Sequence, residues 1–584
     1  MSKAVSRTYL NSTYIRDNGK GVDYVVVSEL VEMDDGSVVP QLKFIPKPKR
    51  VIYYTKPEYR RNTVKKEAEQ IARCDRYVVE NRKIPEEVFR ISKGFYPTRP
   101  MTPKQRSAVL DDLFLYGANI DIRCLVANRY LEDLKKNNKI PLESSIGTLD
   151  IETSVRDDGT YGRIEVISFT YESQCYTAIL KDCMFIIDDG KKIPFTVEDV
   201  EALAKTAIDP RLVDLCNNNK TIHALKDKLP FTRDYRVCAD PLEMVLWIFK
   251  QIHRTKPGFI GVWNILYDMP RLEKVVLDAG LNPADVFCPP EVPPELRQFR
   301  IIPDTSDTQH NVDKWHIIVC PGYTTYIDPM CVYGQLRRIE GKEVSYALDA
   351  ILAKHSLGGK LYETGNRPLP ETTKLQWHVD MQNGYFKEYV VYNQGDVIFF
   401  QMLLWLVRDI YTLVQQCGIS TIDKFPRQTV RLMNKYHFEW QERGEIIGTY
   451  RETPLEEGDD KIVARGGAVL SPKEQIINGW PIIRGWGSHN TAVYIRNYDI
   501  DLSAQYPTAL WSFNIGKDTI ICTVIGIEGE WLEKEGETLD VIENIFARMA
   551  TYEISSVDIG VKVFNLPHYN ETAELFAQKM GYNH

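Results

Sequence analysis

Three short acidic motifs in this 584-residue chain carry side chains that could bind divalent metal ions. Asp150 and Glu152 lie two residues apart in an apolar, strand-like pattern, so both carboxylates project from one face. Asp268 follows a second strand-like stretch, in the kind of loop where site residues concentrate. Tyr392 and Asp396 lie four apart on a predicted helix and share one face. Each motif alone is a common chance match, so the set of three carries the prediction.

Together, the four carboxylates of Asp150, Glu152, Asp268 and Asp396 would be enough to hold two Mg²⁺ or Mn²⁺ ions about 3.5–4 Å apart. That arrangement catalyses in-line displacement at phosphorus, because one ion activates a water and the other stabilises the leaving 3′-oxygen. Tyr392 would orient the water through its phenol, since a pKa near about 10 makes it a poor base at neutral pH. The residues predict a metal-dependent nuclease that needs no nucleophilic side chain.

A fourth motif of a different kind lies near the C-terminal end, at Asp501-Leu502-Ser503-Ala504-Gln505-Tyr506-Pro507. Asp501 follows the strand-like stretch 492–500, and Tyr506-Pro507 indicates a sharp turn into a new element. A single acid at such a turn suggests part of a second metal site.

Strand and helix patterns alternate around the acidic motifs. Apolar strands are expected at 147–151, 164–171 and 259–263, and helices at 346–355 and 387–417. Strands mixed with helices over some 260 residues predict an α/β or α+β domain, and the length predicts about three or four domains in all. The N-terminal region, by contrast, reads as β structure over residues 23–55, with a hairpin turn at Asp35-Gly36.

Composition limits the class of protein. The net charge of −8 argues against nucleic-acid binding over the whole surface. A local basic stretch, Lys43 to Lys66, contains the aromatics Phe44, Tyr53, Tyr54 and Tyr59; it fits either phosphate contact with base stacking or a solvated face. The eleven cysteines are scattered without a Cys-x-x-Cys pair, which argues against a zinc site and a disulfide framework. We expect a soluble, intracellular protein without a membrane span.

The trio resembles the Exo I, Exo II and Exo III motifs of the DEDDy proofreading exonucleases in family B DNA polymerases, most closely those of T-even-like bacteriophages. Asp501 to Pro507 is similar to motif A of the same family. Further segments fall in the family's order: Tyr326-Ile327-Asp328-Pro329-Met330, Ser345 to Ile351, Gly359-Lys360-Leu361-Tyr362 and Arg465-Gly466-Gly467-Ala468. The resemblance covers roughly residues 140 to 525.

This resemblance implies an RNase H-like domain over 141–409 that removes mispaired nucleotides from a primer 3′ end. It implies that the four carboxylates are metal ligands, that Tyr392 orients the water, and that Asn264 contacts the terminal nucleotide. Ala347 departs from the family pattern, in which a serine or threonine contacts single-stranded DNA. The other domains would be an N-terminal domain over 1–140, completed by 410–470, and the first part of a polymerase palm, with a possible start of the fingers, over 471–584.

For motif A, the resemblance implies that Asp501 binds the polymerase metals, that Tyr506 stacks under the nucleotide sugar, and that Leu502 and Ser503 belong to the substrate-binding segment. Ala504-Gln505 replaces the usual Ser-Leu, so a hydroxyl expected near the triphosphate is missing.

After Tyr506 the chain contains neither a Lys-x-x-x-Asn-Ser-x-Tyr-Gly fingers motif nor an Asp-Thr-Asp motif C. A two-metal site with one of its carboxylate strands cannot hold its ions. We therefore expect the N-terminal subunit of a split polymerase, completed by a second polypeptide. It would act on a DNA primer-template, a single-stranded 3′ end and dNTP, with a sliding clamp as a further candidate partner, in the host cytoplasm if phage-encoded. Two alternatives stay open: a free-standing DEDDy exonuclease with a relic motif A, and a non-catalytic replisome component that binds DNA.

Overall fold

The computed structural model describes residues 3–448, apart from 18, 61–64, 67, 157–158, 219, 307–309, 339–340 and 362–373. Beyond residue 448 it describes four short strands: β19 (Ile483–Arg484), β20 (Ala492–Val493), β21 (Thr523–Gly526) and β22 (Ile559–Lys562). The chain divides into two compact units. The first comprises residues 1–61 and 68–449, and the second comprises 62–67 and 450–584. In the second unit, β19 pairs with β20 and β21 with β22, both antiparallel.

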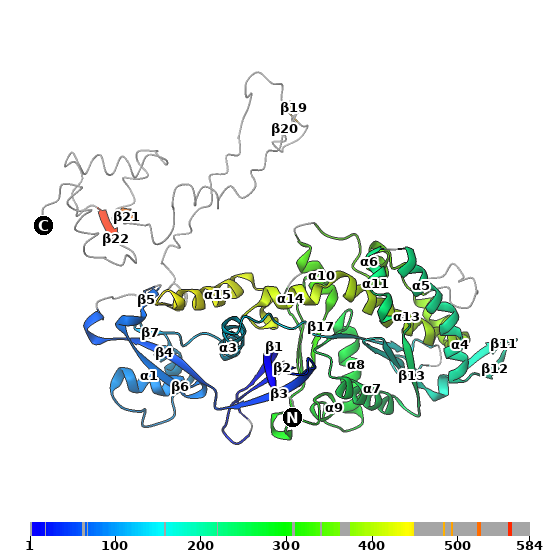
Figure 1. The fold of residues 1–584 in the computed structure, drawn as a ribbon, viewed down its shortest axis with the longest axis horizontal. Coiled ribbons are helices and arrows are strands. Elements are labelled where there is room, and N and C mark those ends of the chain that lie inside the picture. The colour runs from blue at the N-terminus through cyan, green and yellow to red at the C-terminus, as the bar shows by residue number, and fades with distance from the viewer. Residues whose placement is uncertain are drawn as a thin grey trace. The chain divides into compact units, whose positions relative to one another are not determined.

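The first unit contains a six-stranded mixed sheet (Figure 1). Its strands, in spatial order, are β13 (Thr232–Cys238), β10 (Gln174–Leu180), β9 (Ile164–Tyr171), β8 (Ile146–Thr153), β14 (Phe259–Gly261) and β17 (Thr325–Ile327). Strands β8 and β10 each run antiparallel to β9, which lies between them. Strand β14 is parallel to both β8 and β17, and β13 is parallel to β10. The predicted mixture of strands and helices is confirmed at this level.

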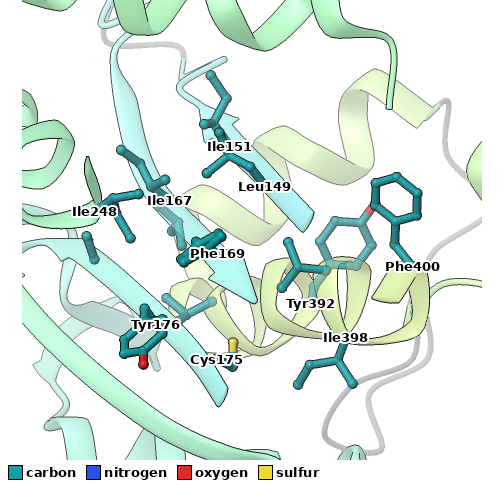
Figure 2. Close-up of a cluster of buried hydrophobic side chains, with 14 of the residues drawn as sticks. Leu149, Ile151, Ile167, Phe169, Cys175, Tyr176, Ile248, Tyr392, Ile398 and Phe400 are labelled. Atoms are coloured by element: carbon teal, nitrogen blue, oxygen red, sulfur yellow. The ribbon is translucent and has the colours of Figure 1, made fainter. Parts of the chain in front are cut away.

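The two faces of this sheet differ because strand residues alternate between them. Leu149, Ile151, Ile167 and Phe169 lie on the face with Ile248 of α7 (Pro241–Thr255) (Figure 2). The opposite face meets α13 (Phe386–Val407), and it carries polar side chains as well as apolar ones. There Thr148 Oγ1 donates to the Val397 carbonyl at 2.8 Å, and Thr170 Oγ1 donates to Gln401 Oε1 at 3.0 Å. The polar face of β8 is therefore held against a helix.

Helix α13 is buried along almost its whole length. Among the described residues it is the one helix with the length and hydropathy of a membrane span, and 83% of that apolar stretch is buried inside the structure. Packing of the helix against β8 and β9 accounts for its apolar character. The predicted helix over 387–417 is interrupted at Arg408, whose φ of 53° is left-handed, and a second helix, α14 (Asp409–Cys417), follows.

The N-terminal part of the first unit contains two further sheets. Strands β1 (Ala4–Ile15), β2 (Tyr24–Met33) and β3 (Val38–Pro46) form one, and β6 (Cys74–Glu80), β4 (Lys49–Thr55) and β7 (Leu115–Tyr116) form the other. Helix α3 (Ile122–Lys136) packs on β1. The chain returns to this part after α14, through α15 (Gln428–Glu442) and β18 (Glu445–Ile447), which pairs with β5 (Ala68–Gln70). The predicted domain boundaries stay predictions.

The basic stretch Lys43 to Lys66 supplies several residues to this N-terminal core. Tyr53 and Tyr54 are buried, so their rings are not available for base stacking. The Arg50 side chain is also buried and donates to the carbonyl oxygens of Ala118 and Ile120. These three residues fit neither reading of the stretch, because β4 is the central strand of its sheet and is covered on both faces: Tyr54 belongs to one apolar cluster and Tyr53 to another.

Candidate metal centre

Asp150 and Glu152 lie on the face of β8 that meets α13, as the two-residue spacing predicts. Asp396 reaches the same place from α13. One carboxylate oxygen from each of the three residues lies within 4.8 Å of the other two. Glu152 and Asp396 are buried and Asp150 is half-buried. Three converging carboxylates offer hard oxygen ligands of the kind that Mg²⁺, Mn²⁺ and Ca²⁺ prefer, so this group could bind a divalent metal ion.

One face of α13 supplies the hydrogen-bond donors for the β8 carboxylates. Tyr389 Oη donates to Glu152 Oε2 at 2.6 Å, and Asn393 Nδ2 donates to Asp150 Oδ2 at 2.7 Å. Tyr389, Asn393 and Asp396 follow one another at helical spacings of four and three residues, which places them on one face. The helix that contributes a carboxylate therefore also orients the other two.

Helix α12 (Lys374–Gly384) in turn holds Tyr389 in place. Gln382 is fully buried, and its Nε2 donates to Tyr389 Oη at 3.2 Å and to the Thr153 carbonyl at 2.8 Å. Its Oε1 accepts from the Val155 N–H at 2.8 Å. His378 Nδ1 lies 2.8 Å from the same phenol oxygen. This network ties α12, α13 and the end of β8 together around Glu152.

A lysine ammonium also lies among the carboxylates. Lys360 Nζ donates to a carboxylate oxygen of Asp396 and to Tyr392 Oη, the latter at 3.0 Å. Burial lowers the pKa of Lys360, but the negative charges of Asp396, Asp150 and Glu152 outweigh it and raise the pKa above its ordinary value. Lys360 is therefore charged, and it partly neutralises the carboxylates around it.

The carboxylates nevertheless repel one another. Burial raises the pKa of Asp150 to about 7, and the charge of Asp396 adds to this effect while Lys360 opposes it. Burial and the charge of Asp150 raise the pKa of Glu152 well above its ordinary value. A divalent cation would relieve the repulsion between the carboxylates, and its bonds to their oxygens would compensate for the lost hydration. The donor set therefore fits such an ion in both chemistry and charge.

Asp268 lies in the first turn of α8 (Ile265–Asp278), outside the group of three oxygens within 4.8 Å. Burial, and then the charges of Asp150 and Glu152, raise the pKa of Asp268 well above its ordinary value. Its carboxylate therefore interacts electrostatically with the group. The structure thus brings three of the four predicted metal ligands into one cluster and places the fourth beside it.

Asn264, predicted to contact a nucleotide, immediately precedes α8 and lies in the left-handed region with φ 63°. Its N–H and that of Ile265 donate to the carboxylate of Asp328, at 3.3 and 3.0 Å. Asparagine tolerates this conformation better than most residues. Its position thus has a local structural reason, and contact with a nucleotide stays a prediction.

Sequence reasoning gave no role to Lys360, Tyr389, Asn393, Gln382 or His378. Tyr389 and Asn393 did have a signal, since they share a helix face with Asp396. Gln382 had none, because its partner Thr153 lies 229 residues away. The predicted motif A residues Asp501, Leu502, Ser503 and Tyr506 lie outside the described residues, as do Arg465 to Ala468.

A scan against protein-family models found no matching family, and a search of curated proteins found no match. The case for a function therefore rests on the residues of the chain and their geometry.

Proposed function

We propose that this chain is a metal-dependent 3′–5′ exonuclease that acts on DNA, the proofreading part of a family B DNA polymerase. The observation that carries the proposal is the cluster of Asp150, Glu152 and Asp396 oxygens between β8 and α13. The order and directions of the six strands support the RNase H-like arrangement that the sequence resemblance implies. The position of Asp268 beside the cluster supports a fourth ligand.

Asp150, Glu152, Asp396 and Asp268 would hold two Mg²⁺ or Mn²⁺ ions. When bound, such ions polarise the scissile phosphate and make water a better nucleophile at neutral pH. Tyr392, whose phenol oxygen accepts from Lys360, would orient the attacking water. The ammonium of Lys360 adds positive charge where the phosphate would enter, which favours the extra negative charge of the transition state. Tyr389 and Asn393 keep the β8 carboxylates in the orientation that ligation requires.

The test is degradation of a 5′-labelled single-stranded DNA by the purified full-length chain with Mg²⁺. We expect shortening from the 3′ end, abolished by EDTA and by the double variant Asp150→Ala with Glu152→Ala. A matched control is Glu58→Ala with Asp227→Ala, which removes two exposed acids and should leave the activity unchanged. Undiminished degradation by the Asp150/Glu152 variant, or none by the wild type with Mg²⁺ or Mn²⁺, would contradict the proposal.

The polymerase part of the proposal rests on the motif A sequence, with Asp501 as a metal ligand and Tyr506 beside the nucleotide sugar. That site also needs Asp-Thr-Asp and Lys-x-x-x-Asn motifs, which are not among these 584 residues and would be supplied by a polypeptide that carries them. The test is primer extension by this chain with and without such a polypeptide. Extension should need both chains and be lost in Asp501→Asn. Extension by this chain alone would contradict this requirement.

A further inference from the structure

A cavity of about 810 Å³ opens in the N-terminal part of the first unit and shares no lining residue with the carboxylate cluster. Its walls come from the β1–β2 connection, the junction of β3 and β4, the segment from the end of β6 into α1 (Ile84–Lys93), and the start of α2 (Pro103–Leu110). All four lie in the blue part of the ribbon in Figure 1. Segments distant in the sequence therefore form one concave surface.

This cavity is strongly cationic. Of its lining residues, three are acidic and six are cationic, the latter being Arg16, Lys20, Lys47, Arg82, Lys83 and Arg106. The chain as a whole is acidic, with a net charge of −8, so a local excess of three positive charges runs against the general balance. A low-dielectric concave wall concentrates the field of such charges.

Two of the cations are neutralised within the wall. Lys83 Nζ pairs with Glu80 at 3.0 Å, and Arg106 Nη2 pairs with Glu86 at 2.8 Å. These pairs use two of the three lining acids. The third acid, Asp23, accepts from Tyr14 Oη at 3.0 Å, and burial raises its pKa. The acids thus leave part of the positive charge uncompensated.

Lys20 Nζ pairs with Glu295 Oε1 at 3.9 Å, outside the lining, so the charge without an acidic partner among the described residues belongs to Arg16 and Lys47, which come from two different walls. Arg16 and Lys47 are exposed and have no ion-pair partner in the part of the chain that the structure describes. Arg82 pairs through Nη2 with Asp17 at 3.2 Å, while its Nη1 is buried and lacks a hydrogen-bond partner among the described residues. The Arg82 side chain still lines the cavity and adds a guanidinium to its wall.

The backbone fixes Lys47 at the cavity. Its φ of 45° is left-handed, which costs a non-glycine residue about 1 kcal/mol or more. The conformation is held because the Lys47 N–H donates to the Asp23 carbonyl at 2.9 Å. The Asn81 N–H donates to the Pro48 carbonyl at 2.8 Å and joins the same junction to the neighbouring wall. Backbone hydrogen bonds therefore join the β3–β4 junction, which carries Lys47, to two neighbouring walls of the cavity.

We propose that this cavity binds the phosphate groups of a nucleotide or of a nucleic-acid strand. Guanidinium groups match phosphate oxygens in geometry as well as charge, and the volume lies in the usual range for small-ligand sites, about 300–1,000 Å³. None of the described residues that line the cavity is aromatic, so they offer a base no stacking platform. Binding follows the number of phosphates: a triphosphate binds more tightly than a monophosphate, and the identity of the base matters little.

The experiment measures binding of ATP, AMP and a short oligothymidylate to the full-length protein in EDTA, at several salt concentrations. Arg16→Glu with Lys47→Glu is the test variant, because both side chains are exposed and their loss breaks no ion pair of the described structure. The control, Lys181→Glu with Lys250→Glu, makes the same change in net charge at exposed positions of the sheet domain. Thermal unfolding verifies that both variants are folded.

We expect ATP to bind more tightly than AMP, and the test variant to lose binding while the control keeps it. For a strand, the slope of log K against log salt should fall by about one for each cation removed. Loss of ATP binding alone identifies a free nucleotide as the ligand, and loss of oligonucleotide binding alone identifies a strand. Equal losses in both variants, or no binding of either probe to the wild type, would overturn the proposal.

Discussion

Tyr389 donates a hydrogen bond to Glu152 across the interface of α13 and β8, at 2.6 Å between the phenol oxygen and Oε2. The phenol also receives a bond from Gln382, which is itself bonded to the end of β8. A buried carboxylate held in this way loses little further freedom when it binds a metal. This relationship makes Tyr389 a positioning residue for the proposed reaction.

Tyr389→Phe should lower kcat of the 3′–5′ exonuclease by roughly 10- to 100-fold and raise the Mg²⁺ concentration needed for half-maximal rate. KM for DNA should change little, because Tyr389 is buried behind Glu152. Steady-state kinetics against DNA and Mg²⁺ measure both effects. Tyr436→Phe, at a tyrosine that is 44% exposed, is the control and should match the wild type. A change in KM alone would contradict the positioning role.

Asp150→Asn should stabilise the metal-free protein at alkaline pH. The raised pKa of Asp150, about 7, means that the folded state holds this proton more tightly than the unfolded chain. Stability from this group is therefore complete below about pH 4 and is lost as pH rises through 7.

In EDTA, the unfolding temperature of Asp150→Asn minus that of the wild type should increase from pH 5 to pH 8. Addition of Mg²⁺ should raise the unfolding temperature of the wild type and have a smaller effect on the variant. If the advantage of the variant over the wild type were larger at pH 5 than at pH 8, the predicted direction of the pH dependence would be wrong.

His437 should make the protein less stable as pH falls. Burial, with a smaller contribution from the charge of Arg50, lowers the pKa of His437 to about 4. The unfolded chain takes up this proton near pH 6.5, so stability falls as pH drops from about 6.5 to 4, by about 2–3 kcal/mol. Denaturant unfolding of the wild type and His437→Gln at pH 7 and pH 4.5 measures the effect. The free energy of unfolding lost between pH 7 and pH 4.5 should be smaller in the variant than in the wild type. Equal losses would contradict this role of His437.

Gly147→Ala should destabilise the sheet that carries the carboxylates. A Cβ at this position would lie 2.5 Å from the Thr170 carbonyl oxygen and 2.9 Å from Phe169 Cε2. Because backbone of a central strand cannot move cheaply, we expect a loss of about 2–3 kcal/mol in the free energy of unfolding. Gly384→Ala, where a Cβ meets no atom within 4 Å, is the control and should change stability by less than about 1 kcal/mol. Denaturant unfolding compares the two.

Local periodicity in the sequence was sufficient for several elements of the fold. The strand predicted at 164–171 is β9, and those predicted at 147–151 and 259–263 overlap β8 and β14. Strand β17 was not predicted, because a three-residue strand is too short for its alternation to stand out. The order of the strands in the sheet could not be predicted from local periodicity either, because it depends on which strand edges pair after long connections.

For the candidate site, the sequence by itself determined the direction of the side chains. The two-residue spacing of Asp150 and Glu152 and the four-residue spacing of Tyr392 and Asp396 follow from strand and helix geometry. Tertiary structure decided which faces meet: it set Tyr389 against Glu152, brought Lys360 into the cluster, and left Asp268 beside it. It also buried Tyr53 and Tyr54, two of the four aromatics for which base stacking was one of two open interpretations. Side-chain direction is a property of neighbouring residues, whereas burial and charge pairing depend on partners that the chain brings together only when it folds.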